Sequence, residues 1–473
     1  MTSVPNLLLQ LSGNKSALRS FFNLFFMVAI GLLLTSCGGT DKATNRTSKR
    51  STSKSTNGKK VTKIKKRKEV KEIEWTEAKD DSKPPIKEPV MTKLGSAEII
   101  KEDIYDITYF IPFEAGEYAN SQSASDRFVQ YYSGLLVATE ILEREGVNLN
   151  INVVDEKKRK FEDILPLSVS QETDVIVGPY MRDNLRFAAE VAAQNQIPLV
   201  SPWQASNTIA KDNPYYVQLR PNLDEHYYSI FEDIKTNYED LENVYILGRL
   251  NSPNDKDAKR TNKLQKMAKD VWGENDEHHL KEYMLIKDSI DMGVTAFDSV
   301  FVEDKTSVMI IPNWSFEDEA FIYGALRRLS VEKGMSKVVV YGMPIMIESD
   351  KINFDYYNSL NMKVARSKFV DEEDGDVIRF KRDFVAKYGA LPTDDAYEGY
   401  DNLMYIGRNL NKYGKNFQFF LNKDQGYYLQ AKYNVEPSRV DSPDDRMEMI
   451  NYFENKNVDI IEFKNNRFAR NTK

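Results

Sequence analysis

Short runs of β-branched and aromatic residues alternate with longer amphipathic segments along this 473-residue chain, from about residue 99 onward. The first run, Ile104–Phe113, predicts a buried strand. The segment that follows, Asp126–Glu145, places Phe128, Leu135 and Leu142 on one helical face. Because successive parallel strands need a long crossover, usually a helix, this alternation favours parallel sheets covered by helices.

The same alternation continues to about residue 341. Further strands are predicted at Leu149–Val154, Asp174–Gly178, Ile197–Ser201, Tyr215–Arg220, Asn243–Leu247, Lys281–Ile286, Ser307–Pro312 and Lys337–Tyr341. Helices are predicted at Phe161–Val169, Asp183–Asn195, Asp224–Tyr238, Asp257–Val271 and Glu317–Lys333. The pattern of the first half recurs in the second, so we expect an α/β protein with two doubly wound parallel-sheet lobes.

The N-terminus has the parts of an export signal. Lys15 and Arg19 precede an apolar stretch, Phe21–Leu34, which is shorter than the about 20 residues that a membrane-spanning helix needs. The sequence Leu34-Thr35-Ser36-Cys37-Gly38 resembles a bacterial lipobox, and Cys37 is the only cysteine in the chain. The resemblance implies a signal peptide over residues 1–36, lipidation of Cys37 (palmitate among its acyl chains) and a membrane anchor without a spanning helix.

A basic segment separates this signal from the rest of the chain. Residues 1–41 carry a charge of +1, residues 42–68 carry twelve Lys/Arg and no acid, and the net charge is −7, which leaves −20 for residues 69–473. Residues 37–98 are too polar to bury a core, so we expect a disordered tether. A basic run is often a nucleic-acid site, but an exported chain does not meet nucleic acid.

Several segments of the body resemble the type 1 periplasmic binding fold of branched-chain amino-acid receptors. The likeness is carried by Tyr132-Ser133-Gly134, Asp174–Pro179, Asn195–Ser206, Pro214–Pro221, Phe384, Tyr388-Gly389, Pro392 and Gly399-Tyr400-Asp401. It implies two lobes with a ligand between them. We expect lobe 1 to comprise residues 99–221 and 346–425, and lobe 2 to comprise residues 222–345 and 426–473.

Ligands of open α/β sheets bind beyond the carboxyl ends of the strands. Residues that follow predicted strands are therefore candidates for ligand binding: Tyr180, Arg182, Ser201, Trp203, Gln204 and Ser206 in lobe 1, and Arg249, Asn251, Asn313, Trp314 and Met343 in lobe 2. Four of them are large, namely Tyr180, Trp203, Trp314 and Met343, which favours a cleft narrowed or filled by the protein's own side chains.

The sequence departs from the amino-acid receptors at two places. Arg182 stands where these receptors usually have a small hydroxyl residue that holds the ligand carboxylate, and Gly248–Asn251 replaces their Tyr-Gly pair. Gly178–Leu185 instead resembles outer-membrane lipoprotein activators of peptidoglycan synthases, which act by contacting a partner protein. Two roles are open for Arg182. Its guanidinium could bind a carboxylate or phosphate of a ligand, or it could form an ion pair with Asp183 or Asp212 on the surface.

The sequence contains no phosphate-binding glycine loop followed by Lys-Ser/Thr, no Gly-x-Ser-x-Gly elbow and no helical His-Glu-x-x-His motif. His278 and His279 are adjacent, and adjacent side chains diverge, so a metal site there is not favoured. We therefore expect no enzyme activity, no cofactor and no metal.

The functional expectation is a non-enzymatic outer-membrane lipoprotein, on the periplasmic face, whose two-lobed domain binds a ligand or docks an envelope protein. The ligand would be an amino acid, a peptide or a cell-wall fragment. The alternatives are a substrate-binding receptor for amino acids or short peptides that feeds a transporter, and a regulator of peptidoglycan synthesis.

Overall fold

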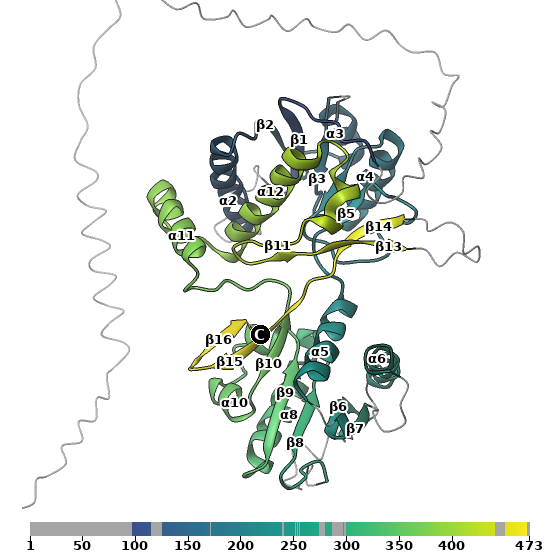
Figure 1. The fold of residues 1–473 in the computed structure, drawn as a ribbon, viewed down its shortest axis with the longest axis vertical. Helices are drawn as coiled ribbons and strands as arrows, with labels where there is room; N and C mark the ends of the chain where they lie inside the picture. Colours follow the sequence, from purple (N-terminus) through teal and green to yellow (C-terminus); the bar gives the residue numbers. More distant parts are fainter. Residues whose placement is uncertain are drawn as a thin grey trace, which may run out of the picture. The chain divides into compact units, whose positions relative to one another are not determined.

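The computed structural model describes residues 97–114, 125–170, 172–238, 241–250, 252, 254, 256–273, 280–285, 297, 299–439 and 450–470. The predicted signal peptide, Cys37, the basic segment, Asn251, His278 and His279 lie outside these residues. The described residues build two seven-stranded sheets and one two-stranded sheet (Figure 1). No helix within these ranges is long and apolar enough to cross a membrane.

The first sheet has the strand order β13-β14-β5-β4-β3-β1-β2. Its strands are β1 (Tyr105–Ile111), β2 (Leu149–Asp155), β3 (Val175–Val177), β4 (Leu199–Ser201), β5 (Tyr216–Gln218), β13 (Val435–Arg439) and β14 (Ile450–Asn455). All neighbours are parallel except β13 and β14. Six of the seven residues of β1 are buried, as expected for a parallel strand that is covered on both faces.

Helices cover both faces of this sheet. They are α2 (Ser125–Arg144), α3 (Phe161–Ser168), α4 (Arg182–Asn195), α11 (Gly375–Tyr388), α12 (Asp394–Tyr413) and the 3₁₀ segment η4 (Phe417–Lys423). Ile107 and Tyr109 of β1 pack with α2 and α12 on one face, while Phe110 packs with α3 and α4 on the other. Alternate residues of one strand therefore enter two separate apolar layers.

Helices α2 and α12 lie side by side because glycines face each other's backbone (Figure 1). A Cβ atom on Gly134 would overlap the carbonyl oxygen of Ala396, and one on Gly399 would overlap the carbonyl oxygen of Tyr131. The two helices can reach this separation only if both positions lack a side chain.

The second sheet has the order β16-β15-β10-β9-β8-β6-β7. Its strands are β6 (Val244–Arg249), β7 (Lys281–Leu285), β8 (Thr306–Ile310), β9 (Lys337–Gly342), β10 (Lys363–Arg366), β15 (Asp459–Lys464) and β16 (Arg467–Arg470). The strands from β10 to β7 are parallel, and β15 and β16 are antiparallel to their neighbours.

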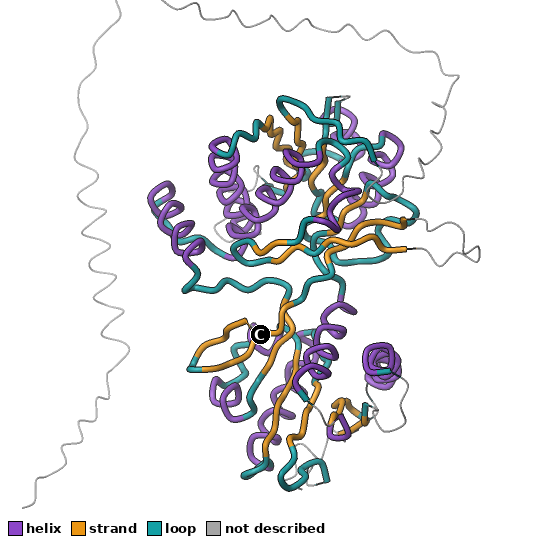
Figure 2. The backbone as a smooth tube through the Cα atoms, viewed as in Figure 1, coloured by secondary structure: helices purple, strands orange, loops and turns teal. Residues whose placement is uncertain are grey.

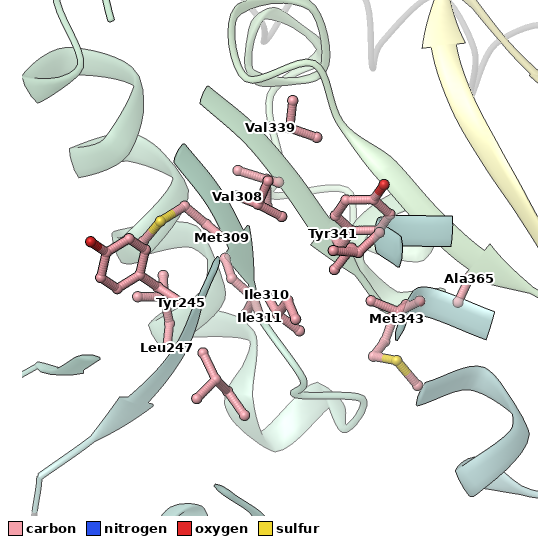
Figure 3. Close-up of a cluster of buried hydrophobic side chains, with 14 of the residues drawn as sticks. Tyr245, Leu247, Val308, Met309, Ile310, Ile311, Val339, Tyr341, Met343 and Ala365 are labelled. Carbon is pink, nitrogen blue, oxygen red and sulfur yellow. The ribbon is translucent and has the colours of Figure 1, made fainter. Parts of the chain in front are cut away.

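The helical segments of this lobe are α5 (Leu223–Asn237), η1 (Leu241–Asn243), α6 (Lys256–Trp272), η3 (Phe316–Asp318), α8 (Glu319–Glu332), α9 (Ile345–Glu348) and α10 (Phe354–Ser359). Figure 2, viewed as in Figure 1, shows α5, α8 and α10 beside the strands of this sheet. Ile246, Val308, Ile310 and Val340 belong to one buried apolar cluster, part of which is drawn in Figure 3.

The two main sheets confirm the predicted α/β class with two lobes dominated by parallel strands. The strands and helices predicted up to residue 341 are observed within a few residues of their expected bounds, apart from residues that are not described. Strands β10 to β16 were not predicted; among them, β11 (Gly426–Tyr427) and β12 (Lys432–Tyr433) form the small sheet.

The chain crosses between the lobes at two places that differ from the expected boundaries at residues 346 and 426. Lys363 of β10 pairs with Tyr341 of β9, so the chain stays in lobe 2 beyond residue 346 and leaves it only between β10 and α11. Phe453 of β14 pairs with Val217 of β5, so lobe 1 extends to residue 455. The points at which the chain crosses depend on which sheet each strand joins, and this pairing is between residues far apart in sequence.

Candidate functional site

The carboxyl ends of β3 and β4 place the predicted lobe-1 residues together. Trp203 follows β4 and is 4% exposed. Its ring lies 5.0 Å from Tyr131, 5.8 Å from Tyr180 and 5.9 Å from Phe128, measured between ring centroids. Trp203 is therefore a packed member of an aromatic cluster rather than an open stacking platform.

Gly178 makes room for this cluster at the end of β3. Its φ is +84°, and an added Cβ would lie 2.5 Å from the carbonyl oxygen of Phe110 and 3.1 Å from the indole of Trp203. The turn after β3 thus needs glycine both for its backbone conformation and for space.

A carboxylate that was not among the predicted residues lies beside this cluster. Glu156 directly follows β2 and is 2% exposed. Its carboxylate accepts hydrogen bonds from the backbone N–H groups of Tyr180 (3.1 Å) and Met181 (3.3 Å). Burial raises the pKa of Glu156 to about 7, against the opposing effect of these two hydrogen bonds. Its position just after a strand was the signal that could have found it.

Arg182, the first residue of α4, is exposed. Its guanidinium donates to the hydroxyls of Ser206 (3.4 Å) and Thr208 (2.5 Å). Asp183 pairs instead with Arg186, at 3.4 Å. Among the described residues Arg182 has no carboxylate partner, so the predicted pairing with Asp183 or Asp212 is wrong.

The remaining lobe-1 candidates hold the loops in place. The Gln204 side chain donates to the carbonyl oxygen of Tyr180 at 2.7 Å, and the backbone N–H of Ser206 donates to the side chain of Gln218 at 3.0 Å. Ser201 is fully buried. These contacts connect the loops after β3 and β4 to each other and to β5.

The lobe-2 candidates fall into three different environments. Arg249, at the end of β6, binds Asp257 at 2.9 and 3.2 Å and Asp318 at 2.5 Å, and it lies over the Phe321 ring. Asn313 is buried and donates to the same Asp318 at 2.8 Å. The site therefore already contains anions that neutralise Arg249.

Two other lobe-2 candidates differ sharply in exposure. Trp314 is 54% exposed, and its near neighbour Phe316 is 59% exposed. Met343 is 1% exposed and belongs to the buried cluster of lobe 2 (Figure 3). Met343 is thus a core residue, while Trp314 and Phe316 offer apolar surface. No group of three or more His, Cys, Asp or Glu in the described ranges has the arrangement of a metal site.

No model of a known protein family matches the chain, and no curated protein matches it either. Similar solved structures include a putative branched-chain amino acid ABC transporter protein from Rhodospirillum rubrum, with a TM-score of 0.54 and 12% identity over 78% of this chain and 99% of that chain. A branched chain amino acid ABC transporter periplasmic ligand-binding protein from Burkholderia xenovorans has a TM-score of 0.50 and 11% identity, over 78% of this chain and 94% of its own.

LpoA from Haemophilus influenzae is a third similar structure, with a TM-score of 0.50 and 13% identity. The match covers 79% of this chain and 60% of the LpoA chain. At such low identity these likenesses carry the fold alone. The two lobes, their sheet topology and these matches together show that the body of this chain has the type 1 periplasmic binding fold.

Proposed function

We propose that this protein is a lipid-anchored, non-enzymatic component of the outer membrane that docks another protein of the cell envelope. The observation that carries the proposal is the Glu156 carboxylate, which occupies the N–H groups of Tyr180 and Met181. Backbone N–H groups at the start of a helix are natural binding sites for an anion. Here the protein fills that position with its own side chain.

An α-amino acid would meet two obstacles at this edge of lobe 1. Its carboxylate would have to displace Glu156 from the two amides, and its side chain would have to displace the packed Trp203 ring. On lobe 2, Arg249 already has two carboxylate partners. A partner protein needs neither displacement, because it can use exposed groups such as Arg182 and Trp314.

The likeness to LpoA supports this direction, since the LpoA C-domain is described as a regulator of PBP1A. A receptor for amino acids or short peptides that feeds a transporter is the second candidate. It is favoured by the likeness to the branched-chain amino acid transporter proteins and by Arg182, whose observed partners are hydroxyls. Lipidation of Cys37 and attachment through residues 37–98 complete the proposal.

A ligand screen separates the two candidates. A receptor is stabilised by its ligand as RT ln(1 + [L]/Kd), about 2.7 kcal/mol at a hundredfold excess over Kd. We expect no shift in melting temperature of the full chain with branched-chain amino acids, short peptides or muropeptides. A saturable rise with leucine or isoleucine would contradict the docking proposal. A rise with a peptide or muropeptide that is lost in Arg182→Ala would support the receptor and define its ligand class.

Docking is tested by capture of envelope proteins on the immobilised full chain. Arg182→Ala and Trp314→Ala should each reduce recovery of the partner, because both side chains are exposed and both residues come shortly after the carboxyl end of a strand. Arg382→Ala on α11 and Met335→Ala after α8 are the matched controls, since both residues are exposed on other elements, and both variants should capture like the wild type. Equal recovery by all four variants would place the docking surface elsewhere.

A further inference from the structure

The three segments that connect the lobes are joined to one another by buried polar side chains. These segments run from β5 to α5, from β10 to α11 and from β14 to β15. Glu454, Asn455 and Lys456, at the end of β14, make most of the connections, and Glu454 and Asn455 are each 1% exposed. We call these three residues the clamp segment.

Glu454 connects lobe 1 to the first helix of lobe 2. Its carboxylate accepts from the Asn222 side chain (2.6 Å), the Asn222 backbone (3.3 Å) and the Gln218 side chain (3.1 Å). Asn222 is also the N-cap of α5, and its side-chain oxygen accepts from the N–H groups of Asp224 and Glu225. The start of α5 is therefore attached to a buried carboxylate of the first sheet.

Asn455 and Lys456 extend these connections. The Asn455 amide donates to the carbonyl oxygens of Leu219 and Lys432, both at 3.1 Å, so it joins two different segments. The Lys456 ammonium binds Glu454 at 2.9 Å and Glu225 of α5 at 2.7 Å. One cation thus pairs with a carboxylate from each lobe.

Arg470 makes a second connection between the lobes. Arg470 of β16 donates to the carbonyl oxygens of Phe369 (2.6 Å) and Gln430 (3.2 Å) and pairs with Asp459 at 3.0 Å. Phe369 belongs to the segment between β10 and α11, and Gln430 lies between β11 and β12. Arg470 therefore holds this second segment against the start of β15.

From these contacts we propose that the clamp segment and Arg470 hold the two lobes in one arrangement in the absence of any ligand. A hinge that opens and closes must exchange one set of contacts for another of similar free energy. Here a rotation would separate a buried carboxylate and amide from their partners, and buried polar groups are costly to leave unpaired. The lobes then form a pre-organised platform, which favours docking because nothing has to be ordered on binding.

Distances between spin labels test this inference directly. Cys37 is the only cysteine, so Cys37→Ser gives a full chain in which Glu143→Cys on α2 and Met335→Cys after α8 are the only labelling sites. Both positions are exposed. Double electron–electron resonance should give one narrow distance distribution, unchanged by added amino acids. A broad or two-peaked distribution in this protein would overturn the inference.

Replacing the clamp should release the hinge. Glu454→Gln with Lys456→Met removes the charges at similar size and should broaden the distribution or add a second peak. Lys464→Met removes an ordinary ion pair of β15 with Glu462, in which Lys464 is 65% exposed, and should leave the distribution narrow. A narrow distribution in a cooperatively melting clamp variant would also overturn the inference.

If that double variant does not melt cooperatively, Arg470→Gln is measured in its place. A broadened or two-peaked distance distribution in Arg470→Gln would then support the inference, and a narrow one would overturn it. Capture of an envelope protein is measured separately on the unlabelled chain. A broad or two-peaked distribution in the wild type together with normal capture would reject the clamp and keep the docking function. A narrow distribution without capture would keep the clamp and reject the docking function.

Discussion

Glu156 shows how a single buried carboxyl group shapes this protein at the scale of one residue. It lies at the end of β2, holds the amides of Tyr180 and Met181 and is almost completely buried. Because burial raises its pKa from 4.5 to about 7, the folded state binds the proton more tightly than the unfolded state does. Its contribution to stability is therefore complete below about pH 4.5 and is lost as the pH rises through 7.

Glu156→Gln should remove this dependence. The amide oxygen still accepts a hydrogen bond but carries no charge. As the pH rises from 5 to 8, the free energy of unfolding of the variant should therefore increase relative to that of the wild type, by on the order of 3 kcal/mol. Urea unfolding at several pH values measures the difference. Glu162→Gln changes an exposed carboxyl on α3 and should follow the wild-type profile. A constant difference between Glu156→Gln and wild type across this range would contradict the assignment.

At the scale of elements, the pair of helices α2 and α12 depends on Gly134 and Gly399. Gly134→Ala should force the helices apart, because its Cβ would meet the backbone of Ala396 rather than a movable side chain. Overpacking of this kind costs about 1–3 kcal/mol, and the rigid partner places this site at the upper end. Thermal unfolding of the full chain measures the loss.

Gly375 provides the matched control for this prediction. It begins α11, and a Cβ there would have only the end of the Arg379 side chain nearby, at 3.5 Å. Gly375→Ala should leave the melting temperature unchanged or raise it slightly, because alanine favours a helix over glycine by up to about 1 kcal/mol. Equal effects of the two substitutions would show that the helices do not need the close approach.

At the scale of the whole molecule, the proposed anchor predicts where the protein is found. Cys37→Ala should move the chain from the outer-membrane fraction to the soluble periplasmic fraction, because the acyl chains supply most of its attachment. Immunoblots of fractionated cells measure this shift. Ser36→Thr, which keeps the cysteine, should fractionate like the wild type. Retention of Cys37→Ala in the outer membrane would assign the attachment to other residues.

The sequence alone determined the class of the fold. Strand and helix periodicities are local properties, and β1, α2, β6 and α6 were predicted within a few residues for that reason. The alternation of these elements requires parallel sheets, and the strand-end rule placed Tyr180, Arg182, Trp203, Gln204 and Ser206 on one edge, where the structure also has them.

Only the tertiary structure decided which elements complete each sheet and which polar groups meet. The C-terminal strands of both sheets pair with partners far away in sequence, as β14 does with β5. Glu156 meets the amides of Tyr180 and Met181, and Glu454 meets Asn222, 232 residues away. Such contacts depend on where the backbone carries each side chain, and a carboxylate in the sequence looks the same whether it is solvated or buried.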